Sequence, residues 1–372
     1  MLKRSGLLLL ASASLIATAG CREATSSADA LQKAEALYAA HDYAAARVEL
    51  MNALQADPKN VKALLLSANN ALELADGDGA ERAIKLAREA GASEASTKAL
   101  LIRAYLQQML PEKALDLVGK DASPNDDAET YRLRGSAYAA LEKDKEASAQ
   151  YEAGLAKYPD DPRLLVSVAR LRYIEKNLPE AEKLAARAAA LDDKSLDTLI
   201  INADVALAKG DLPTAKSWFD KAAKAYPLNL QAKLGQATVL WQQNDRKGAM
   251  VLAEEVLKAD PKSPVAIMMK ATTLADAGKE EEAIALMKTT VAFFEKDPTA
   301  LRIKGDLELK KGYPASAVRY YQQAVNQIPA DAALRFKLAR AMMKDDDLDG
   351  ARAAIAPVAS DPNLPADLKP LL

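Results

Sequence analysis

The chain has 372 residues, of which 50% are apolar, 5% are aromatic and 27% are charged, so it can bury a sizeable core. Its richness in alanine, leucine, lysine and glutamate favours helix and excludes an all-β fold. One cysteine and one histidine exclude a disulfide framework and a multi-histidine metal cluster, and a formal net charge of −2 gives no argument for nucleic acid.

The first twenty residues have the order of a bacterial export signal. Lys3 and Arg4 precede the apolar run Leu7–Ile16, and small residues follow it. A membrane-spanning helix needs about 20 apolar residues, which neither this run nor any later stretch supplies. We therefore expect export without a transmembrane helix.

Residues 18–21, Thr-Ala-Gly-Cys, resemble the lipobox of bacterial lipoproteins, although that family usually has leucine in place of the threonine. The resemblance implies a signal peptide over residues 1–20, acylation of Cys21, and a short linker over residues 21–26. Several acyl chains bury enough methylene groups, at about 0.8 kcal/mol each, for stable anchoring. In that family an aspartate after the cysteine favours the inner membrane. Because Arg22 stands there, the resemblance implies the periplasmic face of the outer membrane in a Gram-negative host.

Alanine recurs every 34 residues through the rest of the chain, with one step of 33. The ten alanines are Ala46, Ala80, Ala114, Ala147, Ala181, Ala215, Ala249, Ala283, Ala317 and Ala351. A small residue lies twelve positions before nine of them, and a large residue lies four positions after eight. Because helical residues three or four apart share a face, this spacing predicts paired helices in which small side chains face large ones.

Turn residues divide each repeat into two helices. Residues suited to a left-handed turn stand five positions before four of the alanines, at Gly210, Asn244, Gly278 and Gly312. Aspartates that can cap the following helix come next, at Asp42, Asp76, Asp211, Asp245 and Asp347. Each repeat is therefore predicted to be a helical hairpin.

A 34-residue helix-turn-helix repeat with small residues at these offsets resembles the tetratricopeptide repeat (TPR). The resemblance covers ten repeats over residues 27–365, followed by a C-terminal tail over residues 366–372, and implies an all-α superhelical solenoid. The third repeat departs from the pattern, with Ile102 at a small-residue position and a shortened link over residues 119–127. We expect either a tolerated surface loop or a bend at that link.

Two N-terminal segments resemble a narrower group. Residues 46–58 and 80–92 are similar to the first repeats of TPR lipoproteins linked to exopolysaccharide and PEP-CTERM export systems. The resemblance implies a role in exopolysaccharide assembly or export.

Features that carry catalysis or metal binding have structural interpretations here. His41 is the single imidazole and lies at the turn position, where histidine tolerates a left-handed backbone. The acidic runs Asp345–Asp347 and Glu280–Glu282 lie where carboxylates favour a helix N-terminus. No nucleotide or nucleophile motif is present. We therefore expect no enzyme activity, no metal site and no cofactor.

One face of the first helices remains as a candidate binding surface. Its positions lie fifteen, eleven and eight residues before each repeating alanine, and in TPR solenoids this face lines the concave groove. The partner-binding candidates at these positions are Asn69, Arg103, Arg132, Arg170, Tyr173, Trp241, Arg302, Phe336 and Arg340. Arg163, from the first turn of the same row of helices, joins them. Arginine and aromatic residues are typical of binding surfaces. Arg103, Arg132, Arg163 and Arg170 suit an anionic partner, or else form a solvated face paired with local carboxylates.

These features predict a lipid-anchored periplasmic scaffold for protein or peptide clients, anionic ones included, with exopolysaccharide assembly or export as the leading role. Alternatives are pilus or outer-membrane protein assembly, and direct polysaccharide binding along the groove. In the last case Trp241 and Tyr173 would stack on sugar rings while the arginines meet uronic acids.

Overall fold

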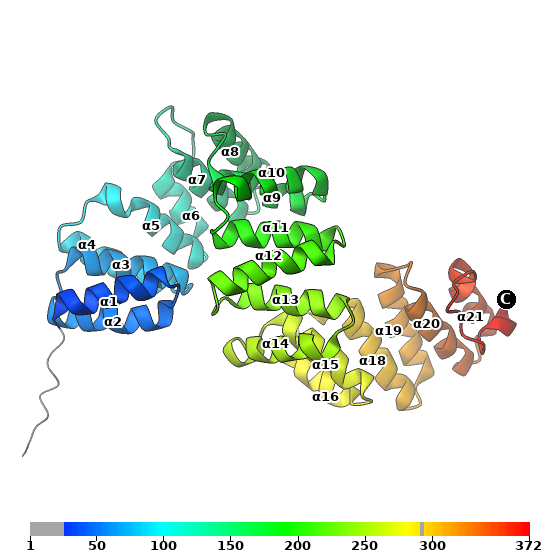
Figure 1. Ribbon diagram of the computed structural model, residues 1–372. Helices are drawn as coiled ribbons and strands as arrows, with labels where there is room; N and C mark the ends of the chain where they lie inside the picture. Colours follow the sequence, from blue (N-terminus) through cyan, green and yellow to red (C-terminus); the bar gives the residue numbers. More distant parts are fainter. Residues whose placement is uncertain (1–25, 291–293) are drawn as a thin grey trace, which may run out of the picture. The chain divides into compact units, whose positions relative to one another are not determined.

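The computed structural model describes residues 26–290 and 294–372, and the regular structure within these ranges is helical (Figure 1). The first five hairpins pair α1 (Ser27–Ala39) with α2 (Tyr43–Ala56), α3 (Val61–Glu73) with α4 (Gly77–Glu89), α5 (Glu94–Gln107) with α6 (Pro111–Val118), α7 (Ala128–Ala140) with α8 (Asp144–Lys157), and α9 (Pro162–Ile174) with α10 (Leu178–Leu191). The other five pair α11 (Leu196–Ala208) with α12 (Leu212–Ala225), α13 (Leu230–Gln242) with α14 (Arg246–Ala259), α15 (Pro264–Asp276) with α16 (Glu280–Met287), α18 (Pro298–Lys310) with α19 (Pro314–Gln327), and α20 (Ala332–Lys344) with α21 (Leu348–Ile355). Short 3-10 helices are η1 (Lys288–Thr290), η2 (Ala356–Val358) and η3 (Lys369–Leu371). The prediction of an all-α chain of helical hairpins is confirmed.

The chain forms two compact units. The first contains the described residues up to Asp121 together with Ser136–Glu142, and the second contains Ala122–Gly135 and Lys143–Leu372. Helix α7 contributes to both. Within each unit the second helix of one hairpin packs against the first helix of the next, as α2 does against α3 and α12 against α13.

The turn inside every hairpin contains a left-handed residue at the predicted position. The ten residues are His41, Ala75, Met109, Glu142, Lys176, Gly210, Asn244, Gly278, Gly312 and Asp346. The structural interpretation of His41 is thus confirmed, with φ at 60° and its Nδ1 2.9 Å from the hydroxyl oxygen of Tyr43. Seven of these ten residues are not glycine, so the left-handed conformation does not depend on glycine at this position. It is set by the repeat as a whole.

The predicted capping aspartates also act as expected. Each accepts a hydrogen bond from the backbone N–H three residues further on, over 2.8–3.1 Å. The acidic runs take part in the same structure: Glu280–Glu282 form the first turn of α16, and Asp347 caps α21. Among residues 26–290 and 294–372, no group of three potential ligands is placed to hold a metal ion.

The repeating alanines are buried where the helices meet, and aromatic rings fill the space beside them. Three of these rings lie directly over a glycine on a neighbouring helix. A β-carbon added to Gly135, Gly235 or Gly305 would approach within 2.4, 2.1 or 2.6 Å of the ring of Tyr151, Phe219 or Tyr321, respectively. The contacts of Gly135 and Gly305, each twelve positions before a repeating alanine, confirm that small residues face large ones at the predicted offsets. Gly235 lies fourteen positions before Ala249 and faces Phe219 of the preceding hairpin.

The irregular link of the third repeat follows a short second helix. Helix α6 has 8 residues and ends at Val118, and the C-cap residue Gly119 has a φ of 91°. The chain then turns back so that the carboxylate of Asp126 meets the guanidinium of Arg134 over 2.8 Å. Arg134 is only 1% exposed, so this ion pair is buried and holds the link against α7.

The C-terminal tail is folded onto the last hairpin. Leu368 and Leu371 are buried in the core cluster of α19, α20 and α21, and Asp367 accepts two hydrogen bonds of 2.7 Å from Arg340. The tail therefore covers apolar surface that a further repeat would otherwise bury.

Candidate binding surface

The predicted groove residues all lie on the first helices of their hairpins. They are Asn69 on α3, Arg103 on α5, Arg132 on α7, Arg163, Arg170 and Tyr173 on α9, Trp241 on α13, Arg302 on α18, and Phe336 and Arg340 on α20. Cys21, the predicted lipidation site, lies outside the described residues.

Phe336 does not line a groove, and this part of the prediction is wrong. Its side chain is 6% exposed and belongs to the same buried cluster as Leu368 and Leu371 of the tail. The tail closes over α20, so an aromatic residue at this position contributes to the core.

The first of the four candidate arginines belongs to a different compact unit from the other three. Arg103 belongs to the first compact unit and pairs with Glu73 over 3.2 Å. Arg132, Arg163 and Arg170 belong to the second unit.

In the second unit, two of the arginines meet at one carboxylate. Glu129 lies 2.7 Å from Arg132 and 3.0 Å from Arg163. Burial disfavours the charge of Arg132, but the hydrogen bonds and charge of Glu129 outweigh it and raise the pKa of the guanidinium.

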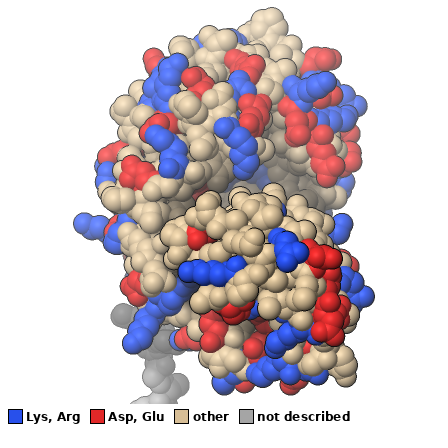
Figure 2. Space-filling model, turned by 90° about the vertical axis from the view of Figure 1, so that its right-hand side faces the viewer, with Lys and Arg blue, Asp and Glu red and all other residues tan. Residues whose placement is uncertain are grey.

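Arg170 pairs with Asp197 over 3.3 Å. Each of the four candidate arginines thus has a local carboxylate as a partner. Figure 2 shows the same intermingling of acidic and basic side chains on the face that it presents. A joint anionic site made by these four residues stays a prediction.

The two groove aromatics have charged neighbours. The guanidinium carbon of Arg246 lies 3.7 Å from the ring centroid of Trp241, so one face of the indole is covered. Near Tyr173, burial raises the pKa of the Asp204 carboxyl to about 6, and the positive charge of Arg170 only partly opposes this shift. The covered indole face leaves less ring surface for stacking on a sugar.

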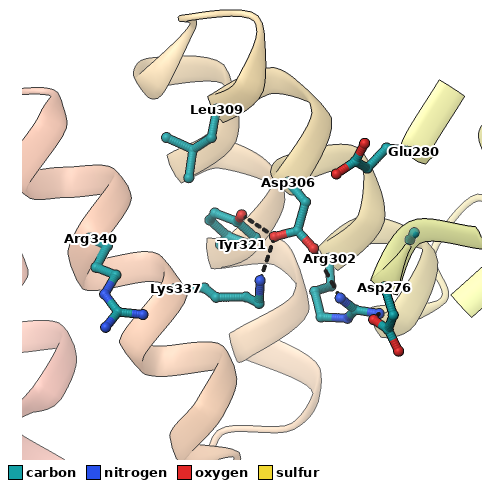
Figure 3. Close-up of a pocket in the computed structure, with 9 residues that line it drawn as sticks. Asp276, Glu280, Arg302, Asp306, Leu309, Tyr321, Lys337 and Arg340 are labelled. Carbon is teal, nitrogen blue, oxygen red and sulfur yellow. Dashed lines mark hydrogen bonds and ion pairs between the residues drawn. The ribbon is translucent and has the colours of Figure 1, made fainter. Parts of the chain in front are cut away.

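A polar pocket on the groove face lies in the last three repeats. It has a volume of about 480 Å³ and is lined by Ala275, Asp276, Glu280, Arg302, Asp306, Leu309, Tyr321, Lys337 and Arg340 (Figure 3). Arg302, Asp306 and Leu309 occupy all three groove offsets of α18, and Arg340 occupies the middle offset of α20.

Asp306 is the centre of this pocket, and three side chains point toward its carboxylate in Figure 3. The Tyr321 hydroxyl donates to Oδ1 over 2.6 Å, Lys337 Nζ donates to the same oxygen over 2.7 Å, and Arg302 Nη1 donates to Oδ2 over 2.9 Å. Burial, and then the hydrogen bond to Asp306, raise the pKa of Tyr321, so its phenol keeps the proton that it donates.

Gly305 makes this arrangement possible. The Tyr321 ring occupies the space in which a side chain of residue 305 would lie. The small residue predicted at this offset therefore brings a buried aromatic ring close enough for its hydroxyl to reach Asp306 on the next position of α18.

Comparison with known families gives the same class of repeat. Models described as tetratricopeptide repeat match residues 202–264, 240–307 and 308–369. With these matches and the ten hairpins, the predicted fold class is confirmed: the chain is an all-α TPR solenoid. TPR proteins are generally non-enzymatic scaffolds that bind protein partners.

Several solved structures are similar at low sequence identity. A TPR protein from Parabacteroides merdae is 14% identical, with 76% of this chain and 98% of that chain covered and a TM-score of 0.44. A chain of the Cut9-Hcn1 hetero-tetramer of APC/C is 14% identical, with 91% of this chain and 88% of that chain covered and a TM-score of 0.41. PilW, a type IV pilus biogenesis factor, is 20% identical, with 57% of this chain and 98% of that chain covered and a TM-score of 0.38. No curated protein sequence matches the chain significantly.

The helices in the described part of the chain are too short or too polar for a membrane span.

Proposed function

We propose that the protein is a scaffold that holds segments of partner proteins against the groove face of its first helices. The observation that carries this proposal is the pocket around Asp306, where groove positions of consecutive repeats converge on one open, polar cavity. Its charged groups are held by internal hydrogen bonds before any partner arrives. Binding there loses little side-chain entropy, which favours recognition of a flexible segment.

A paired charge reversal tests the scaffold. Arg170 and Arg340 are about half exposed at groove positions, so Arg170→Glu/Arg340→Glu should preserve helicity and abolish capture of partners from membrane extract of the producing cells. Lys224→Glu/Lys344→Glu makes the same change of charge at exposed positions outside the pocket and should capture partners normally. Equal recovery of the same partners by both variants would show that the groove face is not the working surface.

We also propose that the scaffold is anchored by acylated Cys21 at the periplasmic face of the outer membrane and serves exopolysaccharide assembly or export. The lipobox-like residues 18–21 support the anchor, and the resemblance of residues 46–58 and 80–92 supports the pathway.

Cys21→Ser should remove fatty-acid labelling and reduce exported polysaccharide, because the proposed anchor is the covalent lipid. Metabolic labelling, fractionation and polysaccharide assay measure these effects, with Ser26→Ala as a control outside the lipobox. Persistent fatty-acid labelling of Cys21→Ser would refute acylation of Cys21. Normal polysaccharide export in cells whose Cys21→Ser protein is unlabelled and released from the membrane would show that export does not need the anchor.

A further inference from the structure

Most charged residues in the middle row of the groove face have a partner. This row lies eleven positions before each repeating alanine, and its charged members are Glu35, Arg103, Arg170, Asp204, Asp306 and Arg340. Every one of them except Asp204 forms an ion pair with a side chain of opposite charge. Within residues 26–290 and 294–372, no hydrogen bond or ion pair holds the Asp204 carboxylate.

Asp204 lies half-buried on α11, and its groove-face neighbours on α11 and α13 carry no charge. Ile200 and Leu207 lie one turn away on the same face of α11. Helix α13 packs beside α11, and its residues at the three groove offsets are Leu234, Thr238 and Trp241. A carboxylate in such surroundings is costly to keep charged unless a partner supplies the opposite charge.

Arg170, on the adjacent helix α9, compensates this charge only in part. Burial raises the pKa of the Asp204 carboxyl to about 6, and the positive charge of Arg170 lowers it by less than burial raises it. Arg170 is paired instead with Asp197 over 3.3 Å, so one guanidinium faces two carboxylates. These three residues therefore leave one negative charge in excess.

Two further cations in this part of the groove lie over aromatic rings. Lys176 Nζ lies 6.0 Å from the ring centroid of Tyr173, and the guanidinium carbon of Arg246 lies 3.7 Å from that of Trp241. Neither cation changes the pKa of the Asp204 carboxyl, so both are too distant to neutralise it. The unpaired carboxylate is therefore available to a cation from outside the chain.

We propose that Asp204 binds the cationic side chain of a lysine or arginine within a segment of a partner protein. The proposal rests on the scaffold function above and names the chemistry that one of its sites recognises. The carboxylate accepts charge-assisted hydrogen bonds from the cation, and the methylene stem of the same side chain packs on Leu207. A metal ion needs more ligands than this single carboxylate supplies, and no group of three potential ligands is placed to hold one anywhere in the described ranges.

The test measures fluorescence anisotropy of the whole chain with labelled peptides in about 0.15 M salt, which screens contacts with other surface carboxylates. The probe alternates serine and lysine and has an acetylated N-terminus, so that its only cations are side chains; its twin carries glutamine. The lysine peptide should bind at least about tenfold more tightly than the twin, and Asp204→Asn should remove most of that difference. Asp193→Asn removes the same charge at an exposed position before α11 and should leave binding unchanged.

A pH titration gives a readout specific to Asp204. Because only the ionised carboxylate attracts a cation, the affinity for the lysine peptide should fall several-fold between about pH 7.5 and about pH 5, where lysine side chains stay charged. Of the described helices packed against α11, only α9 contributes groups coupled to this carboxyl, Arg170 and Tyr173, and both keep their protons over this range. Asp204→Asn should bind weakly and without this pH dependence; if it loses helicity, Asp204→Ser replaces it.

Four outcomes would overturn the site. They are equal binding of the lysine and glutamine peptides, equal weakening by Asp193→Asn and Asp204→Asn, an unchanged lysine-peptide affinity across the pH range, and displacement of the peptide by an equal concentration of spermidine, which would assign the carboxylate to a free polyamine. If the lysine peptide fails while the Arg170→Glu/Arg340→Glu variant still loses its partners, the scaffold stands and only the Asp204 site falls.

Discussion

Asp126→Ala is expected to lower the free energy of unfolding by about 3–5 kcal/mol, because it removes a carboxylate that pairs with a buried guanidinium. Arg134 is 1% exposed and lies 2.8 Å from Asp126. Arg134 also donates a 3.1 Å hydrogen bond to the side-chain oxygen of Gln150, which is neutral and so does not supply the negative charge that Asp126 loses. Denaturant unfolding followed by circular dichroism measures the change.

The double variant Asp126→Ala/Arg134→Met separates the contribution of the ion pair to stability from other effects of changing the link. With both charges removed, most of the lost stability should return, since an apolar side chain can fill the buried volume. Asp121→Ala, an exposed position in the same link, should change stability by less than about 0.5 kcal/mol. A double variant no more stable than Asp126→Ala would mean that the buried charge is not the cause.

The regular part of the fold could be predicted because the same sequence features, a spaced alanine and a turn between two helices, recur in every repeat. The spacing of alanines such as Ala215 and Ala249 locates the helix contacts, and aspartates such as Asp211 locate the helix starts. Arg134 could not be predicted as a buried residue. Its burial depends on the link over residues 119–127 turning back onto α7, and no repeat offset contains that information.

The candidate site could be predicted only to the level of a helix face. The offsets include Arg302 and Arg340, which line the pocket, but they leave out Lys337, which follows the buried Phe336 in the sequence. Neighbouring residues on a helix differ by about 100° in direction, so one position separates core from pocket. Tyr321 lies four positions after Ala317, where the repeat pattern predicts a large packing residue, and its hydroxyl adds a polar contact that the pattern does not reveal.

Gly235→Ala is expected to destabilise the middle of the second unit by about 1–3 kcal/mol, although helix propensity alone predicts the opposite sign. Replacing glycine by alanine inside a helix favours the helix by about 1 kcal/mol. At this position, however, the new β-carbon would lie 2.1 Å from the ring of Phe219, which is itself 1% exposed and cannot move away without displacing its neighbours. Thermal unfolding measures which effect is larger.

The Gly235→Ala/Phe219→Leu variant supplies the control, since the shorter side chain vacates the space that the new methyl group needs. Its melting temperature should lie above that of Phe219→Leu alone, where the alanine fills part of a cavity and contributes its helix propensity. Because each hairpin packs only on its neighbours, loss of hydrogen-exchange protection in Gly235→Ala should extend from α12 and α13 into α11 and α14. Unchanged protection in those helices would show that strain at this contact stays local and that stability is not shared along the array.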